Sequence, residues 1–142
     1  MTIQFFTGEN RFLSSFYPAI LCYEEIMYPT AEHAYQAAKS GSREIKLIIA
    51  ALHSPGQAKK YGREMKILPY WNDVKLIVMS RVVRVKFKHP ALRQWLLDTG
   101  DEKLIEGNTW GDTYWGVCRG EGENHLGRII MSIREEIQNA QR

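Results

Sequence analysis

Apolar residues recur at helical spacing over most of the chain, whereas alternation typical of strands is confined to short stretches. Val74, Val78, Val82 and Val85 are four, four and three residues apart, which predicts one long helix over residues 74–88 despite the β-branched side chains. The same kind of spacing, with capping and breaking residues at the ends, predicts further helices at residues 30–40, 43–52, 54–62, 92–100 and 126–137.

Strand patterns occur near the start of the chain and again in its last third. Residues 19–23 and 26–28 flank Glu24-Glu25 and predict a small hairpin, and residues 3–6 and 103–106 read as short strands. The 142 residues are 44% hydrophobic and contain no linker or repeat, which fits one domain over residues 1–142. The predicted fold class is helix-rich α+β with a small antiparallel sheet.

Charge and targeting signals restrict the function classes. The net charge of +3 comes from nineteen bases scattered among sixteen acids. This argues against a dedicated sequence-reading nucleic-acid binder, but fits a site for a phosphorylated small molecule or brief contact with nucleic acid. No apolar stretch approaches membrane-span length, no signal peptide pattern is present, and Cys22 and Cys118 form no disulfide framework. We expect a soluble cytoplasmic protein with two free thiols and no membrane partner.

The run from Asn108 to Gly116 places one carboxylate, Asp112, among three large aromatic residues and two glycines. Aromatic faces hold planar rings by stacking, glycines let backbone approach a ligand, and a carboxylate activates water or stabilises a developing cation. The alternative is a glycine-punctuated hairpin whose tryptophans fill the core.

A polar stripe on the predicted helix over residues 30–40 gives a second chemical signal. Glu32, Gln36 and Lys39 share one face because they are four and three residues apart, and Tyr35 borders them. An acid and an amine on one face could act together on a ligand; the alternative is an exposed polar face with a weak salt link. The four histidines show no metal-ligand spacing, so no metal site is predicted.

The segment Tyr70-Trp71-Asn72-Asp73 precedes the predicted long helix. Trp71 could belong to the core, and Asn72 or Asp73 could cap that helix. Three basic residues share one face of the predicted helix over residues 74–88: Arg81, Arg84 and Lys88. This face is either exposed to solvent or contacts a phosphate.

Taken together, these signals resemble the NADAR superfamily, which includes the YbiA-like N-glycosidases. The ordered motifs that carry the resemblance span nearly the whole chain. They are Phe6-x-Gly8, Leu13-Ser14-Ser15-Phe16-Tyr17-Pro18, the segment from Tyr28 to Lys39, Trp71, Met79, Lys86-Phe87, Leu96-Leu97-x-Thr99-Gly100, Leu104-Ile105-Glu106, Trp110-Gly111-Asp112-x-x-Trp115-Gly116-Val117 and Asn124-x-Leu126-Gly127-x-x-x-Met131-x-Ile133-Arg134. Ser15 stands where the family usually has Asn, so a ligand contact there is altered.

The resemblance implies cleavage of an N-glycosidic bond between a ribose-type sugar and a base nitrogen. One branch of the family hydrolyses phosphorylated early intermediates of riboflavin biosynthesis, and the other removes ADP-ribose from guanine in nucleic acid. The resemblance places functional residues at Glu32, Trp71 and Asp112. Neither route requires a metal or a redox cofactor.

From the residue types, Glu32 and Asp112 are the candidate carboxylates for bond cleavage through an oxocarbenium-like transition state. Lys39 would contact phosphate or form a transient Schiff base with the opened sugar. Which acid activates water is left open, and a non-catalytic ADP-ribose or nucleotide-binding module is the alternative function. The further candidate substrate contacts are Ser15, Phe16, Tyr35, Gln36, Asn108, Trp110, Gly111 and Trp115.

Overall fold

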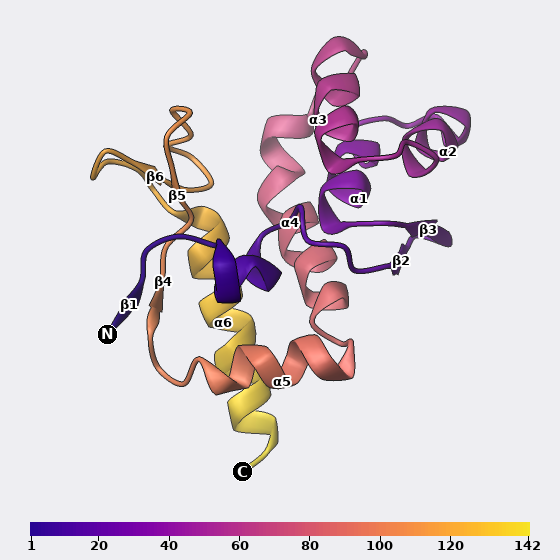
Figure 1. Cartoon of the computed structure of the whole chain (residues 1–142). Coiled ribbons are helices and arrows are strands. Elements are labelled where there is room, and N and C mark those ends of the chain that lie inside the picture. Colours follow the sequence, from indigo (N-terminus) through magenta and orange to yellow (C-terminus); the bar gives the residue numbers. More distant parts are fainter. The chain divides into compact units, whose positions relative to one another are not determined.

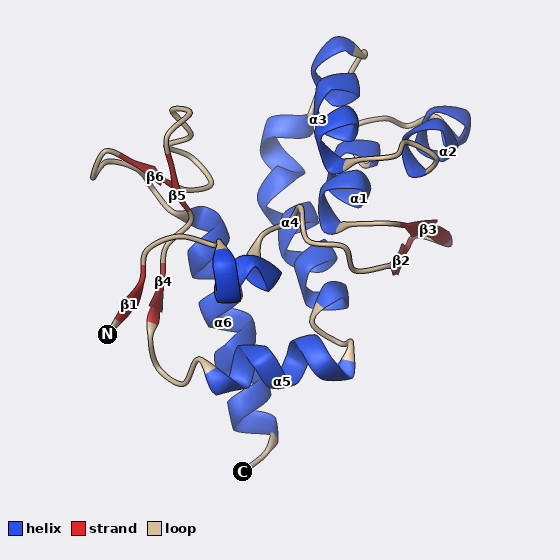
Figure 2. Cartoon of the chain, in the orientation of Figure 1, coloured by secondary structure: helices blue, strands red, loops and turns tan.

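The computed structural model describes all residues 1–142, which form two compact units. One unit is the continuous segment Ser15–Lys86, and the other joins Met1–Ser14 to Phe87–Arg142. Both are dominated by helices with short strand pairs beside them (Figures 1 and 2), so the predicted helix-rich α+β class is confirmed. No helix has the length and apolar character needed to cross a membrane.

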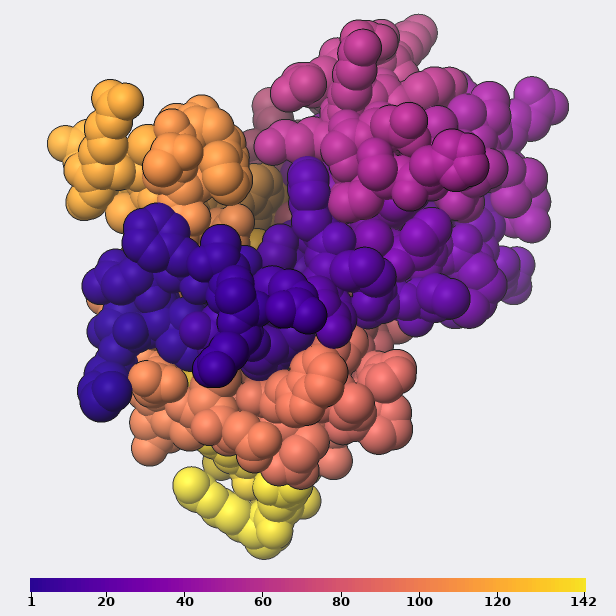
Figure 3. Space-filling model, in the orientation of Figure 1, coloured from indigo at the N-terminus to yellow at the C-terminus, as the bar shows by residue number.

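The Ser15–Lys86 unit consists of a hairpin followed by four helices. Its elements are β2 (Leu21–Tyr23), β3 (Ile26–Tyr28), α1 (Ala31–Ala37), α2 (Arg43–Ala50), α3 (Pro55–Glu64) and α4 (Trp71–Lys86). The two strands pair antiparallel, which confirms the predicted hairpin. In the space-filling view, the hairpin and the α2–α3 segment, coloured purple to magenta, form one continuous body (Figure 3).

Helix α1 lies at the centre of this unit, where it contacts α2, α3 and α4. All seven of its residues are buried, and Ala31, Ala34 and Ala37 are completely so, because small side chains let the neighbouring helices approach closely. Two members of the predicted polar stripe, Glu32 and Gln36, are therefore enclosed by protein, so an exposed polar face does not hold for them. Lys39 lies beyond the end of α1 and is half-buried.

His33 anchors the first turn of α1. The N-cap residue Thr30 accepts the backbone N–H of His33, and its hydroxyl lies 2.8 Å from His33 Nδ1. His33 Nε2 lies 3.0 Å from the carbonyl oxygen of Leu52, which can only accept, so Nε2 carries the proton. Burial lowers the pKa of His33, which keeps the ring neutral and the network intact.

The second unit is built around the C-terminal helix. Its elements are β1 (Thr2–Ile3), the 3₁₀ helix η1 (Gly8–Leu13), α5 (Pro90–Asp98), β4 (Lys103–Leu104), β5 (Gly107–Asn108), β6 (Val117–Cys118) and α6 (His125–Ala140). α5 crosses α6, and β4 runs beside α6 (Figure 1). The buried Arg134 of α6 donates to Thr99 Oγ1 and to the carbonyl of Glu102, which fixes the turn between α5 and β4.

The strands differ from the sequence-based expectation. In place of one small antiparallel sheet there are three separate two-stranded pairs, and both β1–β4 and β5–β6 are parallel. Because β5 and β6 run parallel, the residues between them cannot form a simple hairpin turn. They form a longer connection, residues 109–116, which contains Trp110, Tyr114 and Trp115 and is called the aromatic loop below.

The start of the long helix also differs from the expectation. α4 begins at Trp71, so Asn72 and Asp73 lie inside its first turn and do not cap it. The start of α3, in contrast, follows from local sequence signals. Ser54 and Gln57 form a complete capping box, and Pro55 occupies the first turn.

Candidate functional site

Glu32 and Gln36 form a buried polar pair on α1. Gln36 Nε2 donates to Glu32 Oε2 at 2.5 Å, as expected for residues one helical turn apart. The exposed fractions of the two residues are 8% and 3%. The backbone N–H of Glu32 donates to the carbonyl of Ser15 at 3.1 Å, which ties the start of α1 to the preceding loop. A carboxylate held in this way has little freedom to rotate.

Lys39 follows the same face just beyond the end of α1. Burial lowers the pKa of its amine, the Glu32 carboxylate opposes this, and the cations Lys59, Lys75 and Arg63 lower the pKa further. Its Nζ lies 5.6 Å from the centroid of the Tyr35 ring. A partly desolvated amine of lowered pKa is a stronger nucleophile near neutral pH than a surface lysine, and the surrounding cations also favour an anionic ligand.

Tyr35 and Trp71 form a buried aromatic pair next to this amine. Their ring centroids are 5.2 Å apart at an interplanar angle of 60°, an edge-to-face contact. Leu68 links their supporting segments, because its N–H donates to the Lys39 carbonyl and its own carbonyl accepts the N–H of Trp71. The loop before α4 thus holds Trp71 in fixed relation to Lys39.

Ser15 and Phe16 lie in the loop that precedes the hairpin. Ser15 is buried, whereas Phe16 is 41% exposed, and Lys59 Nζ lies 6.0 Å from the centroid of its ring. An exposed ring next to a cation suits a planar, negatively charged ligand. The sequence analysis did not single out Lys59, which lies on α3 far from the recognised motifs; only its place in the cation group around Lys39 identifies it.

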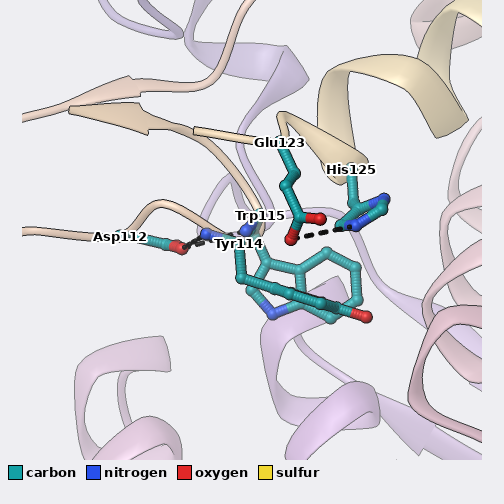
Figure 4. Close-up of polar contacts among 5 residues, drawn as sticks. All are labelled: Asp112, Tyr114, Trp115, Glu123 and His125. Atoms are coloured by element: carbon teal, nitrogen blue, oxygen red, sulfur yellow. Dashed lines mark hydrogen bonds and ion pairs between the residues drawn. The ribbon is translucent and has the colours of Figure 1, made fainter. Parts of the chain in front are cut away.

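Asp112 shapes the aromatic loop in the other unit. Its Oδ1 accepts the backbone N–H groups of Tyr114 at 3.1 Å and of Trp115 at 2.9 Å (Figure 4). This is the local side-chain-to-backbone bonding by which aspartate stabilises turns. One oxygen of the carboxylate therefore has a structural function in the loop.

Asn108 clamps the base of the same loop. Its Nδ2 donates to the carbonyls of Asp112 at 2.8 Å and Val117 at 3.3 Å, and its Oδ1 accepts the N–H of Asp112 at 3.0 Å. Gly116 is needed at the closing end, because a Cβ there would overlap the Glu106 carbonyl oxygen and lie 2.9 Å from Asn108 Nδ2. The Asn108 amide is thus occupied by the loop itself.

The remaining aromatic residues of the loop differ in exposure. Trp110 is 64% exposed and precedes Gly111, whose φ of +88° favours glycine. Trp115 is half-buried and makes an edge-to-face contact with Tyr114, with ring centroids 4.8 Å apart.

His125 and Glu123 lie beside this aromatic group and were not predicted as site residues. The His125 ring lies 4.5 Å from that of Tyr114, and His125 Nε2 lies 3.4 Å from Glu123 Oε2 (Figure 4). Burial, with a smaller effect of the Glu123 charge, raises the pKa of Tyr114. The sequence signal was weak, because His125 is a single histidine at the start of a helix.

The predicted site residues thus belong to two groups. The segment Ser15–Lys86 carries Ser15, Phe16, Glu32, Tyr35, Gln36, Lys39 and Trp71. The other unit carries Asn108, Trp110, Gly111, Asp112 and Trp115. No group of three or more His, Cys, Asp or Glu side chains is arranged to hold a metal ion.

Comparison with known proteins identifies the family. The model of the NADAR domain matches residues 4–138, which includes most of both units. The chain belongs to the NADAR family. It is 38% identical to the N-glycosidase Npun_R5314 of Nostoc punctiforme, over 98% of this chain and 94% of that protein.

Two further NADAR relatives extend the comparison. The N-glycosidase YbiA of Escherichia coli is 38% identical over 78% of this chain and 71% of its own length. The riboflavin biosynthesis protein VVA0006 of Vibrio vulnificus is 36% identical over 92% of this chain but only 36% of its own length. The solution structure of E. coli YbiA superposes with a TM-score of 0.86 at 30% identity and covers 99% of this chain and 86% of that one. The NADAR, YbiA-like assignment made from sequence is confirmed.

Proposed function

We propose that this NADAR protein is an N-glycosidase that hydrolyses the C–N bond between a phosphorylated ribose, or ADP-ribose, and a base. The observation that carries the proposal is the buried Glu32 carboxylate, held by Gln36 and followed on the same face by the Lys39 amine. Relatives of similar length that are named N-glycosidases support it. The soluble cytoplasmic location and the metal-independent reaction expected from sequence form part of the same proposal.

Glu32 would act on the sugar. Breaking the bond to the base builds positive charge on the anomeric carbon, and a nearby buried carboxylate stabilises that charge more strongly than one in water. The same group can accept a proton from the water that later adds to this carbon in the Lys39 imine described next. The products are the free sugar phosphate, or ADP-ribose, and the base amine.

Lys39 would form a covalent intermediate. The sugar ring opens when the ring oxygen leaves C1 and takes up a proton to become a hydroxyl, which leaves C1 joined to the base nitrogen as an imine. The neutral Lys39 amine then adds to C1, the base leaves as its amine, and an imine joins Lys39 to the sugar. Water then adds to the imine carbon, which releases the sugar and restores the amine. The lowered pKa of Lys39 favours the neutral amine, and Lys59, Lys75 and Arg63 supply positive charge for substrate phosphate.

The aromatic residues would hold the planar base. Trp71 and Tyr35 form a rigid apolar wall, while Phe16 and Trp110 are exposed enough to stack on a ring. Asp112 would be the second acid, acting through the carboxylate that also shapes the aromatic loop.

The proposal is tested by a side-by-side hydrolysis assay without added metal. The purified protein is given ADP-ribosylated guanine in DNA and a phosphoribosylated aminopyrimidine, and the released sugar is followed by mass spectrometry. Release of sugar from either substrate supports the proposed N-glycosidase activity, and the substrate that is hydrolysed identifies the branch of the family. Folded protein that releases sugar from neither, yet binds ADP-ribose in calorimetry, would contradict the proposal and favour the non-catalytic binding module.

Asp112→Asn should lower kcat about 10²-fold while the loop stays folded. An asparagine Oδ1 can accept the same N–H groups of Tyr114 and Trp115, so the substitution removes the charge but keeps the turn. Asp112→Ala should in addition lower the midpoint of thermal unfolding, because both N–H groups lose their acceptor. Activity and circular dichroism are measured on each variant.

The exposed Asp98→Asn, in the same unit, serves as the matched control and should keep wild-type kcat. Wild-type turnover by Asp112→Asn would restrict Asp112 to its structural function in the loop.

A further inference from the structure

We propose that Gln36 is a positioning residue for the Glu32 carboxylate and that Gly62 on α3 provides the space it needs. The inference rests on the proposed function of Glu32. It goes beyond the sequence analysis, which placed Gln36 among the substrate contacts and gave Gly62 no role.

The hydrogen bond from Gln36 to Glu32 defines the position of the carboxylate. Gln36 Nε2 lies 2.5 Å from Glu32 Oε2, and both side chains are buried. The amide nitrogen must face the carboxylate, since the amide oxygen in its place would set two acceptors against each other. Gln36 therefore has one productive orientation.

That orientation directs the amide oxygen of Gln36 at α3. Gln36 Oε1 is buried and has no hydrogen-bond partner. A buried carbonyl without a partner destabilises a fold, so the arrangement is better explained by the needs of Glu32 than by stability.

Gly62 makes room for this oxygen. A Cβ at position 62 would overlap Gln36 Oε1, lie 2.8 Å from its Cδ and lie 3.4 Å from its Cβ. Gly62 is buried in the contact between α3 and α1, so the helix backbone cannot easily withdraw. An alanine at position 62 would therefore displace the Gln36 amide and release the Glu32 carboxylate.

The same helix contains a matched control. Gly56 lies near the start of α3, and a Cβ there would meet only Ser54 Oγ, at 3.8 Å. Both glycine-to-alanine changes replace a helical glycine by a better helix former, but only an alanine side chain at position 62 would overlap Gln36.

The experiment is a double-mutant cycle read by kcat and KM in the hydrolysis assay. Gly62→Ala should lower kcat about tenfold or more with KM within about twofold, since misplaced catalytic groups slow turnover. Gly56→Ala should keep wild-type kcat. In a Gln36→Ala background, where the amide is absent, Gly62→Ala should cause no further loss. Equal losses in both backgrounds would mean that Gly62 acts through helix packing and would overturn the inference.

Gln36→Met provides a test that leaves α3 unchanged. Methionine fills similar space but cannot donate to Glu32, so kcat should fall and the carboxyl titration of Glu32, followed by carbon NMR, should move to higher pH. The Lys39 amine, which interacts with Glu32, is titrated in parallel.

The titration separates the two proposals. A shifted Glu32 titration in a protein that hydrolyses neither substrate would support the positioning role and reject the proposed function. Unchanged kcat and unchanged titration in Gln36→Met, with active wild type, would reject the positioning role alone.

Discussion

Glu32→Gln should lower kcat by about 10³-fold or more and leave the protein folded. Glutamine has nearly the same shape, and its amide oxygen can still accept the hydrogen bond from Gln36. The substitution therefore removes only the negative charge that would stabilise the sugar cation and accept a proton from water. Turnover is measured on whichever substrate the wild type hydrolyses, with circular dichroism as the check on folding.

The exposed Glu64→Gln on α3 is the matched control for this substitution and should be as active as the wild type. The dissociation constant for ADP-ribose or ribose 5-phosphate, measured by isothermal titration calorimetry, should change far less than kcat, because the negative charge is needed most in the transition state. A folded Glu32→Gln protein with wild-type kcat would remove Glu32 from the proposed mechanism.

Lys39→Arg should lower kcat about 10²-fold or more, although it keeps the positive charge. A guanidinium stays protonated and cannot form the imine that an amine forms with an opened sugar. Cyanoborohydride added during turnover should trap wild-type protein as a sugar adduct at Lys39, detected by peptide mass spectrometry, and should leave Lys39→Arg unmodified. The exposed Lys60→Arg on α3 controls for the change of side chain.

The direction of the pH dependence follows from the same residue. Burial lowers the pKa of Lys39, so its neutral, reactive form increases as pH rises through that lowered pKa. Turnover should therefore rise with pH over this range in the wild type. If Lys39→Arg retains most of the wild-type kcat and no adduct forms, Lys39 contacts substrate phosphate and the covalent step is excluded.

Local signals in the sequence predicted the helices and the hairpin well. Capping residues such as Ser54 and the four-residue spacing of valines act within one or two turns, so they are visible without tertiary structure. The partner of β1 was not predictable in this way. Thr2–Ile3 pairs with Lys103–Leu104, about a hundred residues later in the chain, and two residues carry no pattern that specifies a partner or a direction.

The spacing of Glu32, Gln36 and Lys39 was visible in the sequence, but their environment was not. A polar stripe with helical spacing is typical of a solvated face, and only the packing of three other helices around α1 buries Glu32 and Gln36. The hydrogen bonds of Asn108 were equally hidden, because they join it to backbone groups of a loop whose path depends on the parallel β5–β6 pair. The roles of these residues in binding and turnover stay predictions.

The division of the chain at Ser14 and Phe87 has a consequence for biosynthesis. The ribosome completes Ser15–Lys86 as an unbroken segment, which has all of its own elements and can begin to fold during translation. β1, although made first, must wait for Lys103 and Leu104. The Asp112 loop waits longer still, since the N–H groups of Glu123, His125 and Leu126 donate to its carbonyls. A nascent chain thus contains the complete Glu32 and Lys39 segment well before the loop around Asp112 can form, and a chain that terminates early lacks the residue that we propose as the second acid.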